Sequence, residues 1–453
     1  MTSAPADPAT FPDPKEAEVS EDKREVFGWQ MYDWAWSAFS TTVTTALLGP
    51  YLLELAEDNG GVEVLGFDVE PASFFPFCVS LSAIIQVLLL PLVGSIADHT
   101  DRKKRLMMTL AYAASAATAG LFLVTGTTIL VGGLLFIIAG IGFSAASVVY
   151  NSYLPDIAPP HRRDRVSSAG FAYGYLGGGL WLAANFALIT LMDDTGLAVR
   201  ISLGGTGIWC LVFFAAFPER LIRTRPASRP RPPNTGWLGL SFRSVFTTLA
   251  EMRRQYPITL RYLVAYLIFN DGIQTVIVVS TSFAKDELPG VEAEDLLLLV
   301  LMIQFVAVPG AILFGRLAER YGAKQALAAN LCVWVGLVVF AYVFLRSLSQ
   351  LWMMGVVLAV VLGGSQALSR SLYAQMIPTN SEAEYFGFYE IAARGTSWIG
   401  PLVFGVVNQI TGSQRQAILS LIVFFVVGLI LLLPVRVRDA MVAAGHDPEG
   451  VVH

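Results

Sequence analysis

Gly94-Ser-Ile-Ala-Asp98-His-Thr-Asp101-Arg102-Lys103-Lys104-Arg105 is a short charged segment between two long apolar runs, and the expected fold follows from this arrangement. A charge-free run of 26 residues, 72–97, precedes it, and another of 50 residues, 106–155, follows it. Runs of this length cross a bilayer as α-helices. The charged segment is therefore expected to be a tight loop that joins two transmembrane helices.

A second copy of this segment, Gly315-Arg-Leu-Ala-Glu319-Arg320-Tyr-Gly322-Ala-Lys324, lies about half a chain length later. The two copies match in their glycine, their acid and one lysine. The same number of residues separates Gly94 from Gly315, Asp98 from Glu319, and Lys103 from Lys324. An aspartate also lies in the first expected helix of each half, as Asp33 and Asp271. This repetition predicts that the chain consists of two related halves.

The composition places the chain among membrane proteins. Of its 453 residues, 55% are hydrophobic and 14% are charged, and the mean hydropathy is +0.59. A soluble domain carries about 25% charged residues, so a polytopic membrane protein is expected. The net charge of −5 says little about partners, and the bases lie at helix ends, so nothing indicates nucleic-acid binding.

The sequence lacks the motifs of an enzyme or of an ATP-driven pump. It has no phosphate-binding Gly-rich Lys-Ser/Thr motif, and its four histidines form no cluster with acids at metal-ligand spacing within the apolar runs. Cys78, Cys210 and Cys332 form no disulfide or metal pattern either. We therefore expect no catalytic residue, no bound metal and no cofactor.

The apolar runs predict an all-α polytopic membrane protein with twelve transmembrane helices in two pseudo-symmetric six-helix bundles. The expected helices are 27–55, 72–97, two within 106–155 that divide at 126–128, 166–192, 201–218, 257–284, 296–315, 325–345, 347–377, 385–410 and 416–435.

The expected organisation has five parts. They are a disordered cytoplasmic tail (1–26), an N-terminal bundle (27–218), an Arg/Pro-rich cytoplasmic linker (219–256), a C-terminal bundle (257–435) and a cytoplasmic tail (436–453). Bases gather in the loops of one side, which places both termini in the cytoplasm. We expect a monomer in the plasma membrane, surrounded by lipids, with the linker arginines along the anionic membrane surface.

The repeated charged segment resembles the loop signature of the major facilitator superfamily: a glycine, three residues, an acid, a base, then a glycine and further bases. The first copy departs from it at His99 and Asp101, and the second at Ala323. The resemblance implies the major facilitator fold. A turn that merely fixes the topology of the chain is the alternative interpretation of these bases.

Several segments together resemble a narrower branch, the vacuole-effluxer-like family that includes the yeast autophagy-related amino-acid effluxer. They are Tyr32-Asp-Trp-Ala-Trp-Ser-Ala-Phe39, Tyr150-Asn-Ser-Tyr-Leu-Pro-Asp-Ile157, Gly174-Tyr-Leu-Gly-Gly-Gly179, Asn270-Asp-Gly-Ile-Gln-Thr275, Gly363-Gly-Ser-Gln-Ala-Leu-Ser-Arg370 and Glu384-Tyr-Phe-Gly-Phe-Tyr389. Trp36 stands where asparagine is common in the family. The resemblance implies solute transport, with amino acids as an expected substrate class.

Polar and charged residues inside the expected helices are the candidates for binding the small-molecule substrate or a coupling proton, because such groups usually face a cavity or a partner. They are Asp33, Asn151, Asn185, Asn270, Asp271, Gln274, Gln304, Gln366, Arg370, Glu390 and Arg394. Both charge signs suit a zwitterion, whereas the amides suit a sugar or a peptide equally.

Four of these candidates have a structural interpretation as well. Asp33 lies about one turn into its helix and could extend to the membrane surface. Glu390 and Arg394, spaced i, i+4, are expected to pair, either for transport or only for stability. Asp271 lies about 21 Å along its helix from Pro257, so it either faces the central cavity or hydrogen-bonds a neighbouring helix.

The two charged segments are expected to gate the cytoplasmic side. The gating candidates are Gly94, Asp98, Arg102, Lys103, Gly315, Glu319, Arg320 and Lys324. We expect Asp98 and Glu319 to accept charge-assisted hydrogen bonds from nearby arginines, or, for Asp98, from the start of the eleventh helix. Such bonds would favour the state that is closed to the cytoplasm.

These features predict a secondary active transporter that moves a small polar solute, with an amino acid as the expected class, by alternating access. Ion-coupled efflux or exchange is the expected mode. The alternatives are a transporter of sugars, peptides or drugs, a non-transporting receptor or scaffold, and a membrane-embedded enzyme.

Overall fold

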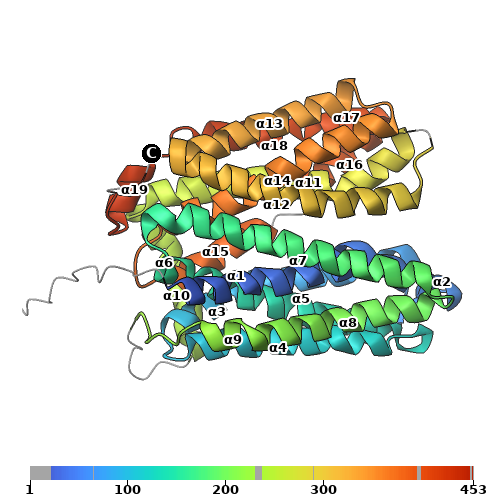
Figure 1. Cartoon of the computed structure of the whole chain (residues 1–453), viewed down its shortest axis with the longest axis horizontal. Coiled ribbons are helices and arrows are strands. Elements are labelled where there is room, and N and C mark those ends of the chain that lie inside the picture. The colour runs from blue at the N-terminus through green and yellow to red at the C-terminus, as the bar shows by residue number, and fades with distance from the viewer. Residues whose placement is uncertain are drawn as a thin grey trace, which may run out of the picture.

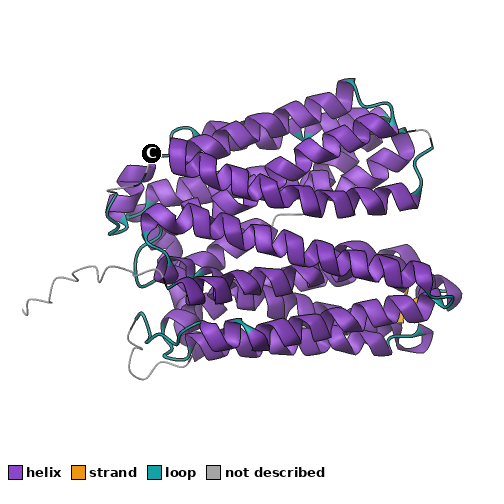
Figure 2. Ribbon diagram, viewed as in Figure 1, coloured by secondary structure: helices purple, strands orange, loops and turns teal. Residues whose placement is uncertain are grey.

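The molecule consists of two helical bundles that lie beside each other, and the helices of both run roughly along its long axis (Figure 1). The computed structural model describes residues 22–64, 66–229, 237–288, 290–394, 399–448 and 451. The expected all-α architecture is confirmed, and most of residues 1–26 lie outside the described part. Short strands lie at the end of the molecule opposite to α19 (Val437–Ala443), as Figure 2 shows.

The N-terminal bundle holds the first half of the chain. Its elements are α1 (Lys23–Ala38), η1 (Phe39–Leu47), α2 (Leu48–Asp58), β1 (Val62–Val64), β2 (Phe67–Val69), α3 (Pro71–Asp98), α4 (Lys103–Gly120), η2 (Leu121–Leu123), η3 (Gly126–Thr128), α5 (Ile129–Asn151), α6 (Leu154–Ile157), η4 (Pro160–Arg162), α7 (Arg163–Leu191) and α8 (Thr195–Ala216).

The second half of the chain forms the connecting segment and the C-terminal bundle. Its elements before α19 are α9 (Pro218–Leu221), α10 (Trp237–Arg254), α11 (Pro257–Glu287), α12 (Ala293–Tyr321), α13 (Ala323–Val343), α14 (Leu348–Met376), α15 (Glu382–Arg394), α16 (Ile399–Thr411), α17 (Gln414–Ser420) and α18 (Ile422–Leu432).

Ten helical segments of the described part are long and apolar enough to cross a membrane. Two further expected spans have a different form. The first corresponds to the continuous run of α1, η1 and α2, and the eleventh to α15 and α16, between which 395–398 lie outside the described residues. The arrangement is therefore consistent with the twelve expected helices.

Some local elements differ from expectation. The first helix is expected as an ordinary helix, but η1 is a nine-residue π-helix, in which Thr41 Oγ1 and Thr45 Oγ1 donate to the carbonyls of Ser37 and Ser40. The acid-rich loop after it contains an antiparallel hairpin, β1–β2. The segment 219–256, expected to be only a linker, contains most of α9 and all of α10.

Glycines allow the helices to pack closely within and between the bundles. A Cβ on Gly177 of α7 would lie 2.6 Å from the carbonyl oxygen of Trp34 in α1, which leaves no room for a side chain. The glycine-rich stretch of α7 thus serves close helix packing, which is one of its usual roles in membranes. Between the bundles, Gly94 of α3 meets α15 and Gly315 of α12 meets α7.

Candidate functional site

A buried ion pair joins the two bundles. Arg370 of α14 is 3% exposed, and its Nη1 donates to Asp33 Oδ2 of α1 at 3.1 Å. Its Nε and Nη2 donate to the hydroxyl and the carbonyl of Ser167 in α7, at 2.9 and 3.0 Å. Because the guanidinium is out of water, it needs these partners. Asp33 is therefore a partner across the interface and does not extend to the membrane surface.

Aromatic side chains surround the Arg370 guanidinium. It lies over the rings of Trp29 and Phe171, 4.6 and 4.2 Å from their centroids, in the geometry of cation–π contacts. The Tyr150 hydroxyl donates to Asp33 Oδ2 at 2.7 Å. Tyr150 was not among the expected site residues, although its segment was part of the family resemblance. Its position next to Asn151 at a helix end is the sequence signal that could have found it.

A second ion pair lies within α15 and also reaches across the interface. Arg394 Nε donates to Glu390 Oε2 at 2.9 Å, as the i, i+4 spacing predicts. Asn151 Nδ2 of α5 donates to Glu390 Oε1 at 2.8 Å, while its Oδ1 lies 3.5 Å from Arg370 Nη1. Asn151 therefore links the two pairs, and we call Asp33, Arg370, Asn151, Glu390 and Arg394 the central ion-pair chain.

Arg394 is the least buried member of the central ion-pair chain. Its side chain is half-buried, whereas that of Glu390 is almost fully buried. The guanidinium lies over the ring of Trp36 from the opposite bundle, 5.5 Å from its centroid. Apart from Glu390, the described residues offer its nitrogens no hydrogen-bond partner. Among the described residues, the other nitrogens of Arg394 therefore remain available to receive an anionic group.

Asp271 of α11 is buried but does not join the central ion-pair chain. It is 2% exposed, and among the described residues no group forms a regular hydrogen bond with its carboxylate oxygens, although the Gly400 N–H lies nearby. The neighbouring Asn270 donates to the carbonyl of Ala393 in α15 at 3.0 Å. A buried carboxylate without partners is costly when charged, so Asp271 differs from the paired acids Asp33 and Glu390.

The remaining candidates lie apart from the central ion-pair chain. Gln366 Oε1 accepts from the Tyr175 hydroxyl at 3.1 Å, which is another contact between the bundles. Asn185 Nδ2 lies 3.5 Å from Thr42 Oγ1, inside the N-terminal bundle. Gln304 is buried where α12 meets α7, and Gln274 is half-buried on α11.

The first charged segment closes the end of the molecule that carries α19. Asp98 Oδ1 and Oδ2 accept from the backbone N–H groups of Ala383 and Glu384, at 3.1 and 2.8 Å, at the start of α15. A Cβ on Gly94 would lie 2.3 Å from the Ala383 carbonyl oxygen, so the glycine permits this approach. We call Gly94, Asp98, Ala383 and Glu384 the terminus-side gate.

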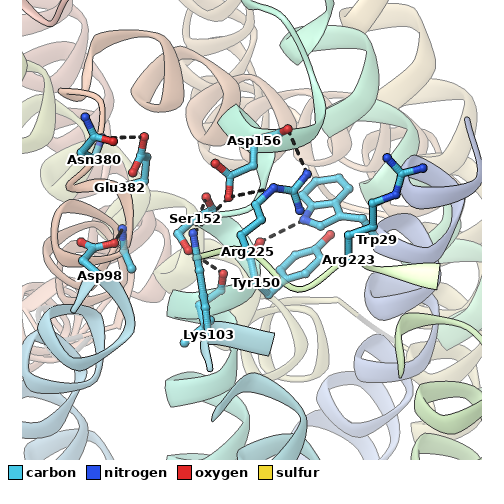
Figure 3. A network of polar contacts seen from close by, with 12 residues as sticks. Trp29, Asp98, Lys103, Tyr150, Ser152, Asp156, Arg223, Arg225, Asn380 and Glu382 are labelled. Carbon is cyan, nitrogen blue, oxygen red and sulfur yellow. Dashed lines mark hydrogen bonds and ion pairs between the residues drawn. The ribbon is translucent and has the colours of Figure 1, made fainter. Parts of the chain in front are cut away.

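A network of charges lies beside the terminus-side gate (Figure 3). Lys103 Nζ is buried and contacts Asp156 Oδ2 at 3.2 Å and the Ser152 carbonyl at 3.3 Å. Arg225, from the segment after α9, donates to both carboxylate oxygens of Glu25 and to the Asp156 carbonyl. These contacts join α1, α4 and α6 to the connecting segment.

The second charged segment does not form the expected contacts. Glu319 is exposed and has no hydrogen-bond partner among the described residues, so the expectation that it accepts bonds from arginines is wrong for this conformation. Arg102 and Arg320 are exposed as well. Lys324 Nζ donates to the Leu433 carbonyl at 2.6 Å. The two segments therefore differ, because only the first lies against the opposite bundle through its acid.

The polar contacts between the bundles are confined to one part of the long helices. Besides the central ion-pair chain and the terminus-side gate, those among the described residues involve α7 between Arg163 and Tyr175 and α14 between Gln366 and Gln375. These stretches lie toward the end that carries α19 and the terminus-side gate (Figure 1). The conformation is therefore closed at this end.

Comparisons with known proteins agree with this architecture. A family model described as vacuole effluxer Atg22 like matches residues 21–445. The chain is 32% identical to the uncharacterized MFS-type transporter YxiO of Bacillus subtilis, over 89% of this chain and 93% of that protein. It is 25% identical to autophagy-related protein 22-1 of Penicillium rubens, over 95% of this chain and 93% of that protein.

A solved structure shares the fold at low sequence identity. The human organic anion transporter MFSD10 matches with a TM-score of 0.68 at 15% identity, over 90% of this chain and 99% of that one. This likeness concerns the fold alone.

Proposed function

The chain belongs to the vacuole effluxer Atg22-like family of major facilitator transporters, and we propose that it moves an amino acid across the membrane by alternating access. It is an integral multi-pass membrane protein and a transporter, not an enzyme. The finer proposal concerns the substrate, the coupling ion and the mechanism.

The central ion-pair chain is the observation that carries this proposal. It places an acid and a base of opposite bundles in contact, Asp33 with Arg370, and a second pair, Glu390 with Arg394, beside them. A substrate with both an ammonium and a carboxylate could exchange with such pairs without leaving a buried charge unpaired. Arg394 is half-buried, and among the described residues only Glu390 contacts its nitrogens, so it would receive the carboxylate.

Alternating access requires that the contacts at one end break while others form at the opposite end. The terminus-side gate and the cross-bundle bonds of α7 and α14 are the contacts that would break. We propose that this end faces the cytoplasm of a cell whose plasma membrane holds the protein as a monomer. The conformation described here would then be the one closed to the cytoplasm.

Asp271 is proposed as the carrier of a coupling proton. Its burial, and the absence of a regular hydrogen bond to its carboxylate among the described residues, favour the neutral form, and a change of exposure during the cycle would release the proton. The alternative is a carboxyl that only contacts the substrate or a neighbouring helix.

The experiment that tests the proposal is flux into proteoliposomes driven by a pH gradient. Amino acids are expected to be transported, and sugars, peptides and drugs are the comparison solutes. If none of these solutes is transported, a receptor or scaffold explains the protein better.

The role of Asp271 is tested with the variant Asp271→Asn in the same assay. Loss of gradient-driven uptake with substrate exchange retained supports a proton carrier, and loss of both supports substrate contact. Uptake at the wild-type rate would contradict both roles.

A further inference from the structure

The helix α10 has two faces with different surroundings. It packs against α3, α11 and α15, and its buried side includes Thr248 and Met252. Thr248 Oγ1 donates to Glu384 Oε1 at 2.5 Å. One face of α10 therefore contacts the terminus-side gate directly.

Glu384 obtains its side-chain partners from the connecting segment. The carboxylate is fully buried, and besides Thr248 its described donor is Arg229 Nη1, which lies 3.2 Å from Oε2. The Arg229 backbone N–H donates to the Asp98 carbonyl at 2.9 Å. Since a buried carboxylate that loses its donors is strongly destabilised, the position of α10 affects the start of α15.

The opposite face of α10 is apolar and basic. Phe246 is 72% exposed and Leu249 46%, and Arg253 and Arg254 are exposed at the end of the helix. Positions 246, 249 and 253 follow the helical period, so they share one face, away from Thr248 and Met252. Glu251, at the edge of this face, is half-buried. Exposed aromatic and aliphatic side chains beside arginines are typical of helices that lie in the membrane interface.

The chain itself places this face at the bilayer surface. Arg254 lies three residues before Pro257, where the membrane-spanning α11 begins. The end of α10 is therefore fixed at the level where the hydrocarbon core meets the headgroups. Anionic headgroups complement the two arginines, and the apolar side chains would enter the outer part of the acyl region.

We propose that α10 binds the anionic phospholipid surface through Phe246, Leu249, Arg253 and Arg254, and that this binding holds Thr248 against Glu384 and so stabilises the closed terminus-side gate. The lipid surface is the partner of one face, and the gate is the partner of the other. Anionic lipid thereby favours the conformation that is closed at this end.

The lipid contact is tested with the full chain in bilayer nanodiscs that contain phosphatidylcholine and phosphatidylglycerol. Native mass spectrometry measures how much phosphatidylglycerol each variant retains. Arg253→Gln/Arg254→Gln should weaken retention about 30-fold, which corresponds to about 2 kcal/mol for two arginines near an anionic surface. The control removes two other exposed arginines, Arg165→Gln/Arg438→Gln, and should retain the lipid.

The coupling to the gate is tested by labelling a reporter, Ala374→Cys, which is buried between the bundles. Exposed Cys332 is first replaced by serine. Phosphatidylglycerol should slow labelling of the parent protein at least threefold and have no effect on the arginine double variant. Thr248→Val should retain the lipid but lose its effect on labelling. Equal lipid retention by the parent and the double variant, or labelling that is insensitive to lipid in the parent, would overturn the proposal.

Discussion

At the scale of single residues, Asp98 joins two bundles with one side chain. Each carboxylate oxygen accepts one backbone N–H of α15, from Ala383 and Glu384. Asparagine has a single acceptor oxygen, and its amide would point N–H groups at one of these donors. The substitution Asp98→Asn therefore breaks one bond and adds a donor–donor contact.

We expect Asp98→Asn to open the terminus-side gate, and labelling of the Ala374→Cys reporter should rise several-fold. Loss of a charge-assisted hydrogen bond costs about 1.5 to 3 kcal/mol. The matched control is Glu319→Gln, because that acid is exposed and should leave the labelling rate unchanged. Unchanged labelling in Asp98→Asn would contradict the gating role.

Arg370 forms the buried ion pair that joins the two bundles. Arg370→Leu would leave Asp33 buried with only the Tyr150 hydroxyl as a described partner, and removal of one member of a buried pair costs about 3 to 5 kcal/mol. A marked fall of the thermal midpoint in detergent is therefore expected. The double variant Asp33→Asn/Arg370→Leu should recover part of it. A double variant less stable than the single one would disprove the pairing argument.

The two ion pairs differ in how far the sequence could predict them. The pair of Glu390 and Arg394 follows from helical spacing, and the structure confirms it. The pair of Asp33 and Arg370 joins residues far apart in the chain, so it depends on how two bundles dock. The periodicity of a single helix contains no information about that docking. The sequence therefore predicts Asp33 and Arg370 as site residues but does not predict that they pair with each other.

At the scale of elements, the approach of α3 to α15 depends on a missing side chain. The Cβ of Gly94→Ala would lie 2.3 Å from the Ala383 carbonyl oxygen, and backbone cannot move aside cheaply. We expect this variant to separate the two helices and to raise labelling of the reporter. Gly336→Ala in α13 is the control, because nothing lies within 4 Å of its added methyl group. Labelling that stays low in Gly94→Ala would show that the helices can shift to accept it.

The membrane-spanning elements were predictable, and the connecting elements were not. Long charge-free runs fix the spans because the hydrocarbon core admits little else. In α10, by contrast, the polar and basic side chains resemble those of a linker, and only packing against α3 and α15 shows which of its faces is buried. The hairpin β1–β2 does have a sequence signal, because Val62, Val64, Phe67 and Val69 alternate with polar positions on either side of Gly66, but each strand is only three residues long.

At the scale of the whole molecule, the repeat of the charged segment predicts two halves but not the difference between them. Glycines of both copies lie against the opposite bundle, Gly94 at α15 and Gly315 at α7. Only the first copy forms hydrogen bonds there through its acid, whereas Glu319 is exposed. The pattern of the repeat cannot reveal this asymmetry, because it depends on how the two bundles dock.

The C-terminal tail adds a pH-dependent contact at the same end of the molecule. After α19, the positive φ of Gly445 turns the chain so that His446 becomes buried. Its Nε2 lies 2.8 Å from the Ile377 carbonyl oxygen, just after α14. Burial lowers the pKa of His446 to about 4, and the nearby charge of Arg163 acts in the same direction. The hydrogen bond to the Ile377 carbonyl acts in the opposite direction but is the smaller effect.

This lowered pKa predicts that the tail detaches as the pH falls. The unfolded or detached tail binds a proton near pH 6.5, whereas the docked tail resists protonation down to about pH 4. Docking is therefore fully stable above about pH 6.5 and weakens on acidification, by about 2 kcal/mol between pH 7 and pH 5. Hydrogen exchange of 437–446, corrected for intrinsic rates, should accelerate about 25-fold over that range.

The control is His446→Gln. Its side chain can still donate to the Ile377 carbonyl but does not titrate, so the exchange of the tail should change little with pH. A tail that exchanges equally at both pH values in the parent protein would contradict the burial of a neutral histidine at this position.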